Sequence, residues 1–167
     1  MKNIDLDRLY EIAAGQAERL SDEMYGIAYL IKKNYDLLSA LSDIRSSGEF
    51  KKKLIADLTP GASKIFTDTI ALLVDQGLLG ELDEVSRRFT LLVAQKNNIR
   101  YDELIFSEKP GPEILGKFYK IGGDKIKFRV QIDSSIAGGF IWKTMDGKVM
   151  DASIKGRLSQ MREEISA

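Results

Sequence analysis

Three aspartates and a lysine near the end of the chain are the residues best suited to chemistry. Asp133, Asp146, Asp151 and Lys155 lie within one short stretch. Carboxylates grouped in this way can bind a hard metal ion or share acid–base work. Structural roles compete with that interpretation, because Asp146 precedes Gly147 in a predicted turn and Asp151 precedes a predicted helix. Asp133 is the only one of the three aspartates without an obvious structural role.

A pair of adjacent glycines, Gly138 and Gly139, follows the predicted strand that ends near Ile132. Consecutive backbone N–H groups at such a pair can cradle a phosphate. The full P-loop pattern is absent, because no Gly-Lys-Ser/Thr follows at the required distance. A β-bulge, or close packing of the backbone against a helix, is the alternative.

The chain contains no cysteine and no histidine. Nucleophilic triads that depend on histidine and the usual zinc sites are therefore excluded. An enzyme built on this sequence would have to use carboxylates, lysine, tyrosine or a hard metal. We expect no bound cofactor and no metal site.

The charges of the chain balance, with 25 basic and 25 acidic residues. Neither half is strongly basic, so nucleic acid is not expected as the main partner. The basic run at 51–53 is typical of a solvated helix face, although it could also touch an anionic surface. The acidic N-terminus does not resemble a targeting peptide, and the run at 70–74 is too short to span a membrane. Any association with a membrane is expected to be indirect.

Apolar residues at spacings of three and four dominate the first part of the chain. This pattern predicts helices over 5–19, 21–41, about 50–58, 62–77 and 80–97. Short amphipathic helices with short connections favour a compact bundle. The first helix and the long second helix are the best suited to leave a groove for a partner helix.

The pattern changes after residue 97. Strands are predicted near 99–106 and 125–132 and in a hairpin around Asp146-Gly147, and a short helix is predicted from Pro112. The last helix begins at Asp151 or Ser153 and carries an apolar stripe formed by Ile154, Leu158, Met161 and Ile165. We therefore expect an α+β fold, with an N-terminal helical bundle at 1–97. A small C-terminal α/β domain with a short sheet and a terminal helix follows at 98–167.

The C-terminal part contains a motif formed by Asp133, Gly138, Gly139, Asp151, Ser153, Gly156 and Leu158. In order and spacing these residues resemble the signature of the F-type ATP synthase delta subunit, or oligomycin-sensitivity-conferring protein, family. Weaker similarity extends over 50–55 and 72–79. We interpret the motif residues as structural, because they would shape the C-terminal domain.

The resemblance implies a non-catalytic stator subunit that ties the catalytic head to the peripheral stalk and resists rotor torque during proton-driven ATP synthesis. Its implied partners are the N-terminal helices of the alpha subunits and the b-subunit stalk, at the cytoplasmic face of the bacterial cell membrane. A groove between the first and last bundle helices would bind the alpha helix. Its expected lining is Leu6, Leu9, Tyr10, Ala13, Phe89 and Leu92.

Two other classes of function stay open from the residues alone. One is a small carboxylate- or metal-dependent enzyme or nucleotide-binding protein, which would use Asp133, Asp151 and Lys155. The other is a generic module that binds amphipathic helices. Stabilisation by a nucleotide with a divalent metal would favour the first class.

Overall fold

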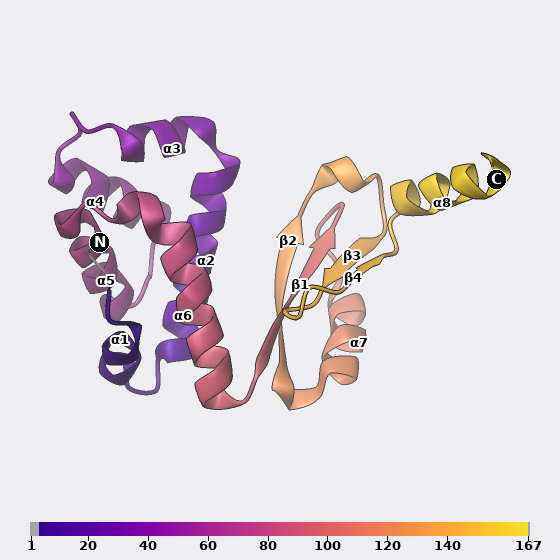
Figure 1. Ribbon diagram of the computed structural model, residues 1–167, viewed down its shortest axis with the longest axis horizontal. Helices are drawn as coiled ribbons and strands as arrows, with labels where there is room; N and C mark the ends of the chain where they lie inside the picture. Colours follow the sequence, from indigo (N-terminus) through magenta and orange to yellow (C-terminus); the bar gives the residue numbers. More distant parts are fainter. Residues whose placement is uncertain (1–3, 167) are drawn as a thin grey trace. The chain divides into compact units, whose positions relative to one another are not determined.

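The chain folds into two compact units, unit 1 (Met1–Gln95) and unit 2 (Lys96–Ala167) (Figure 1). The computed structural model describes the backbone of residues 4–166, and the side chains of residues 4–159 and Met161. In the described part, unit 1 contains only helices, whereas unit 2 combines a sheet with helices. The predicted α+β fold is confirmed. No helix among the described residues is long and apolar enough to span a membrane.

Unit 1 is a bundle of short helices joined by tight turns. Its elements are α1 (Leu6–Ala13), α2 (Ala17–Lys33), α3 (Tyr35–Ser42), α4 (Gly48–Leu58), α5 (Lys64–Gln76), the 3-10 helix η1 (Leu79–Glu81) and α6 (Leu82–Asn97). Side-chain caps set several of the starts. The Asp5 carboxylate accepts a hydrogen bond from the Arg8 N–H at 3.0 Å, and Asn34, Ser47 and Ser63 cap α3, α4 and α5 in the same way.

The predicted helices over 5–19 and 21–41 have the wrong bounds. The chain leaves α1 at Ala14 and Gly15, whose φ angles of 33° and 81° lie in the left-handed region. The second helix is interrupted at Asn34, which ends α2 and caps α3 through its side chain. The single helix predicted over 21–41 is therefore replaced by α2 and α3, which are joined at Asn34.

The core of unit 1 lies between α2, α5 and α6. It is built from fully buried apolar side chains, which include Leu20, Met24, Ile27, Phe66, Leu73, Phe89 and Val93. Ser21 does not start a helix. It is fully buried inside α2, and its hydroxyl forms a 2.9 Å hydrogen bond with the hydroxyl of Thr90 in α6. This bond satisfies two polar groups that would otherwise be costly to bury.

Unit 2 is a four-stranded mixed sheet with one covering helix. Its elements are β1 (Arg100–Phe106), α7 (Pro112–Gly122), the 3-10 turns η2 (Gly123–Lys125) and η3 (Ser134–Ile136), β2 (Ile126–Ile132), β3 (Phe140–Lys143), β4 (Val149–Asp151) and α8 (Ile154–Ser166). The strand order is β2-β1-β3-β4. β1 and β2 are parallel, so α7 is the crossover between them, and β3 and β4 form the predicted antiparallel hairpin.

An aromatic core holds α7 on this sheet. Phe118 of α7 is buried with Leu104 and Phe106 of β1. Its ring makes edge-on contacts with Phe140 and Trp142 of β3, at centroid distances of 5.0 and 5.8 Å. Edge-to-face packing of this kind adds to the stabilisation from buried area.

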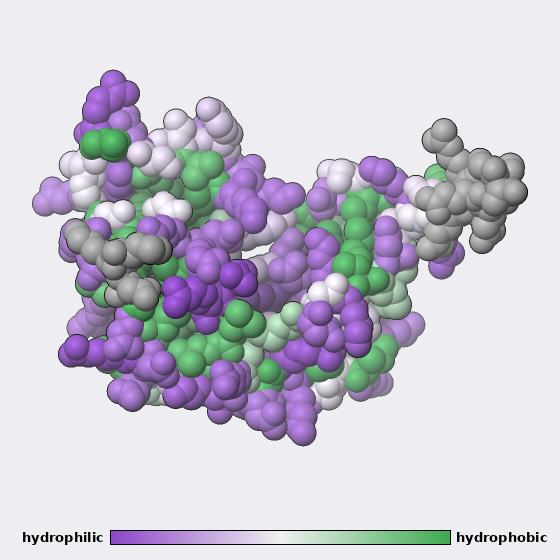
Figure 2. All heavy atoms as spheres, viewed as in Figure 1, coloured by the Kyte–Doolittle hydropathy of each residue, from purple (hydrophilic) through white to green (hydrophobic). Residues whose placement is uncertain are grey.

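Hydrophobic side chains also reach the surface of both units, where Figure 2 shows green patches between hydrophilic atoms. The exposed large apolar residues include Leu38 and Leu91 in unit 1, and Ile121 and Leu158 in unit 2. Exposed apolar residues that recur along one helix face are candidates for partner contacts.

Candidate partner-binding surfaces

Each of the three aspartates identified from the sequence accepts a hydrogen bond from a residue two positions away in the chain. The Asp133 carboxylate accepts from the Ser135 N–H at 3.0 Å, and that of Asp151 accepts from the Ser153 N–H at 2.9 Å. The Ser153 hydroxyl and backbone N–H hold the pKa of Asp151 below its usual value. These hydrogen bonds account for Asp133, the aspartate that sequence reasoning left unexplained.

The third carboxylate, Asp146, stabilises the hairpin. It accepts from the Thr144 hydroxyl and lies 3.2 Å from the Lys148 ammonium group. The hydrogen bond from Thr144, followed by that from Lys148, lowers the pKa of Asp146. Among the side chains that the structure describes, no three carboxylates, histidines or cysteines are grouped as metal ligands. A shallow cavity is lined by Asp151 and Lys155 but not by Asp133.

Five of the seven motif residues meet around the start of α8: Gly138, Gly139, Asp151, Ser153 and Gly156. The Ala152 N–H donates to the Phe140 carbonyl at 2.9 Å, and the Ile154 N–H donates to the Gly138 carbonyl at 3.1 Å. Gly138 and Gly139 have φ angles of +100° and +80°, which L side chains rarely adopt. The glycine pair therefore brings two backbone segments together.

Ser153 and Gly156 complete this group. Ser153 is buried, and its hydroxyl accepts from the Gly156 N–H at 3.0 Å, which makes it the N-cap of α8. A Cβ at Gly156 would lie 2.6 Å from the Asp151 carboxylate. Leu158 differs from the other motif residues because most of its side chain is exposed. Six of the seven motif residues thus have a structural explanation within the chain.

The residues predicted to line a groove between α1 and α6 fall into two groups. Leu6 and Leu92 are half-buried and lie together in a shallow depression with Ile4 and Leu91. Its other lining residues are polar: Asp5, Asp7, Arg88 and Gln95. This surface has an apolar centre with charges of both signs around it, a composition that suits one face of an amphipathic helix.

Three of the four remaining predicted groove residues are buried. Leu9 and Ala13 are buried in α1, and Phe89 is fully buried in α6, whereas Tyr10 is half-buried. The spacing of apolar residues identified the inward side of both helices but could not separate the rim from the core. Within this set, Leu6, Tyr10 and Leu92 are the side chains within reach of a partner.

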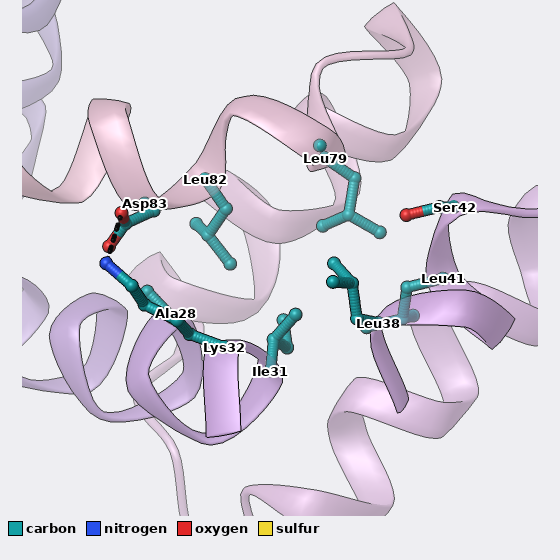
Figure 3. A pocket seen from close by; sticks show the side chains of 10 residues that line it. Ala28, Ile31, Lys32, Leu38, Leu41, Ser42, Leu79, Leu82 and Asp83 are labelled. Atoms are coloured by element: carbon teal, nitrogen blue, oxygen red, sulfur yellow. Dashed lines mark hydrogen bonds and ion pairs between the residues drawn. The ribbon is translucent and has the colours of Figure 1, made fainter. Parts of the chain in front are cut away.

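A second groove in unit 1 lies between α2, α3, η1 and α6 (Figure 3). Aliphatic side chains from all four elements converge on a cavity of about 170 Å³: Ala28, Ile31, Leu38, Leu41, Leu79 and Leu82. Lys32 and Asp83 form an ion pair of 3.3 Å at its edge. Sequence reasoning associated a groove with the long second helix, but missed α3 because it did not recognise the cap at Asn34.

The terminal helix α8 presents an apolar stripe to its surroundings. Ile154, Leu158 and Met161 are each more than half exposed. Their spacings of four and three place them on one face, as in the seam of a coiled coil. Ile165, the fourth predicted member, lies outside the described side chains.

Sequence reasoning missed a fully buried carboxylate in unit 2, at Asp102. Arg100 donates to its two oxygens through two hydrogen bonds of 2.9 Å. The Trp142 indole N–H donates at 2.8 Å, and the Met145 backbone N–H donates at 3.2 Å. Strand alternation could have revealed Asp102. Side chains two residues apart share a face of a strand, so Arg100 and Asp102 lie on the same face of β1 as buried Leu104.

The chain is similar to proteins of one family over nearly its whole length. The family model of the ATP synthase delta (OSCP) subunit matches residues 8–165. ATP synthase subunit delta of Corynebacterium urealyticum is 26% identical over 158 residues, which cover 92% of this chain and 58% of that protein. The protein of the same name from Bacillus mycoides is 25% identical over 153 residues, which cover 89% and 84% respectively.

A solved structure shares the fold. A chain in the cryo-EM structure of the Toxoplasma gondii mitochondrial ATP synthase hexamer aligns with a TM-score of 0.51 and 16% identity. The alignment covers 97% of this chain and 95% of that one. The resemblance that rested on the C-terminal motif is confirmed by the family match.

Proposed function

The chain belongs to the ATP synthase delta (OSCP) subunit family, and from that premise we propose that it is a stator subunit of an F-type ATP synthase. It ties the catalytic head to the peripheral stalk and resists rotor torque, so that proton-driven rotation yields ATP. The observation that carries this proposal is the family match over residues 8–165. The task is mechanical and non-catalytic, and needs interfaces rather than an active site.

The proposal assigns a different partner to each part of the chain. Residues 1–97 form a helical domain that binds the head, and residues 98–167 form an α/β domain that binds the stalk. Two compact units with separate cores support this division. An adaptor under torque gains from such an arrangement because each interface can be stabilised without disturbing the other.

In unit 1 the partner is an N-terminal helix of an alpha subunit, bound between α1 and α6. Leu6, Leu91 and Leu92 offer an apolar strip at this surface. Charged residues of both signs, Asp5, Asp7 and Arg88, lie around this strip. Leu9, Ala13 and Phe89 are buried in the same two helices, and Tyr10 of α1 is half-buried.

In unit 2 the partner is the end of the b stalk, bound by α8. A seam of Ile154, Leu158 and Met161 exposes apolar area that a neighbouring helix would remove from water. Most other positions of α8 are polar in the sequence, as expected for a helix that contacts a single partner. The complex would hold the chain at the cytoplasmic face of the bacterial cell membrane, with no direct membrane contact and no nucleic acid.

Calorimetric titration with a synthetic peptide of the alpha-subunit N-terminus tests the proposal. Leu91→Asp is the variant of choice, because Leu91 lines the surface and is already 44% exposed, so the fold should tolerate the change. Leu72→Asp in α5 is the matched control, since Leu72 is 43% exposed and lies outside this surface. We expect one-to-one binding that Leu91→Asp weakens at least tenfold and Leu72→Asp leaves unchanged.

Two results would count against the proposal. Equal weakening by both variants would remove the assignment of the surface between α1 and α6. Absence of binding by the folded chain, together with thermal stabilisation by a nucleotide and a divalent metal, would replace the stator by a nucleotide-binding function.

A further inference from the structure

Basic residues are concentrated in one segment of unit 2. Residues 109–129 contain six lysines and arginines and two acidic residues, although the whole chain has 25 of each sign. The segment comprises α7, the turn η2 and the first part of β2. A local excess of one charge in a balanced chain favours a partner of the opposite charge.

The α7 helix uses only one of its faces inside the unit. Phe118 is buried, and Leu115 packs beside it in the aromatic core. Beside this buried face, α7 exposes two isoleucines, Ile114 at 46% and Ile121 at 68%. Residues three and four positions apart lie on one side of a helix, so Ile114, Lys117 and Ile121 form a single ridge.

The cations on this side have no internal use. Lys117 and Lys120 are exposed, and neither has an ion pair within the part of the chain that the structure describes. Glu113 is the sole acidic residue of α7. An exposed apolar ridge that includes Lys117, with Lys120 beside it and Glu113 one turn before Lys117, therefore covers about two turns of the helix.

We propose that this ridge is a docking surface for an acidic amphipathic helix of a partner protein. The two isoleucines are separated by seven residues, or about 10.5 Å along the axis, which matches apolar side chains spaced by two turns on a facing helix. Carboxylates on the flanks of that helix would approach Lys117 and Lys120. Charge complementarity selects an acidic partner over a neutral one and sets its orientation.

This surface is separate from the two surfaces of the proposed function. It lies on α7, whereas the proposed stalk contact uses α8 and the proposed head contact uses unit 1. The charge and exposure of α7 are the observations that support this docking surface. The surface would therefore be available in any assembly that contains the chain.

A designed peptide pair tests the inference with the full chain. Both fluorescein-labelled peptides are amphipathic helices with the same leucine stripe, one flanked by glutamate and its twin by lysine. Fluorescence anisotropy should show binding of the glutamate peptide, at least tenfold weaker binding of the lysine peptide, and loss of affinity as salt is raised. The double variant K117E/K120E should lose at least tenfold in affinity for the glutamate peptide and gain affinity for the lysine peptide.

Two further variants sharpen the result. K53E/K64E reverses two exposed lysines of unit 1 and makes the same change in net charge, so it should bind like the native chain. Ile121→Ser should weaken binding of the glutamate peptide without lowering the melting temperature. Equal binding by K117E/K120E and the native chain would overturn the proposal. Capture by anionic vesicles without binding of the peptide would overturn it as well, because the surface would then be lipid-directed.

Discussion

Gly139 lies against the backbone of Ala152, so close that a Cβ at Gly139 would stand 2.4 Å from the Ala152 carbonyl oxygen. The approach is held by the hydrogen bond from the Ala152 N–H to the Phe140 carbonyl. Backbone atoms on both sides leave no flexible side chain to move away. The family motif thus marks a contact that fixes where α8 leaves the sheet.

Replacing Gly139 by alanine should destabilise the chain by about 2–4 kcal/mol, because steric overlap adds to the strain of a positive φ. Gly147→Ala separates the two causes. Gly147 has a φ of +88° but open space around it, so alanine there should cost only about 1–2 kcal/mol. Urea denaturation followed by fluorescence of Trp142, the only tryptophan, measures both. Equal losses would mean that strain alone explains Gly139.

The buried Asp102 should be the most sensitive charge in unit 2. Asp102→Asn removes the charge that Arg100 and the Trp142 indole bond, and we expect a loss of about 2–4 kcal/mol. The value falls below that of a fully buried pair, because the Arg100 side chain is 41% exposed. Because the Trp142 indole N–H donates to Asp102, the fluorescence emission maximum of Trp142 should also shift in the folded variant.

Asp124→Asn is the control for Asp102→Asn, because Asp124 is an exposed aspartate of the same unit. It should change stability by no more than about 0.5 kcal/mol. If Asp102→Asn were equally neutral, the hydrogen bonds around the carboxylate would contribute nothing net to the stability of unit 2.

The elements of unit 2 were predictable from the sequence because alternation along β2 and the Asp146-Gly147 turn are strong local signals. The break between α2 and α3 was not. Ile31, Tyr35 and Leu38 keep helical spacing across Asn34, so periodicity continues where the backbone turns. A capping asparagine inside an apolar pattern looks like an ordinary exposed residue.

For the candidate surfaces, the sequence predicts which side of a helix is apolar, but not which residues on that side stay exposed. Phe89 and Leu92 lie on the same side of α6, yet Phe89 is fully buried and Leu92 is half-buried. Which of the two is covered depends on how α1 and α2 pack against α6, and that is a tertiary fact. Asp102 was missed for a similar reason, since a carboxylate beside Tyr101 in a strand resembles a solvated residue until its partners are known.

Protonation of Asp151 gives unit 2 a defined response to acid. The pKa of this carboxyl is lowered in the folded chain, chiefly by the Ser153 hydroxyl. Its contribution to stability is therefore present above the unfolded pKa of about 4 and is lost as the pH falls through the lowered folded value. The stability difference between the native chain and Asp151→Asn should then shrink in acid.

Urea denaturation at pH 7 and at progressively lower pH measures that difference. In Ser153→Ala, carboxyl carbon NMR shifts should show the pKa of Asp151 closer to its ordinary value. A difference between native and Asp151→Asn that stayed constant with pH would show that the aspartate acts through its shape rather than its charge.

A carboxylate of α2 holds the turn that precedes α5. Glu23 accepts from the Ser63 N–H at 2.9 Å and from the Ser63 hydroxyl, and that hydroxyl in turn accepts from the Phe66 N–H at 3.2 Å. Arg19 supports the same turn through Glu23 and through the Gly61 carbonyl, at 3.0 and 3.1 Å. The start of α5 is therefore bonded to the side of α2.

Glu23→Gln should cost unit 1 about 1.5–3 kcal/mol, because the amide has only one oxygen to accept these bonds and carries no charge to strengthen them. Arg19→Met should cost less than about 1 kcal/mol, since the Arg19 side chain is 58% exposed and its ion pair is screened by water. Circular dichroism at 222 nm during urea denaturation reports mainly on unit 1, which contains most of the helical residues, while Trp142 fluorescence follows unit 2. If Arg19→Met were as damaging as Glu23→Gln, the bond to Gly61 rather than the cap on Ser63 would be what secures α5.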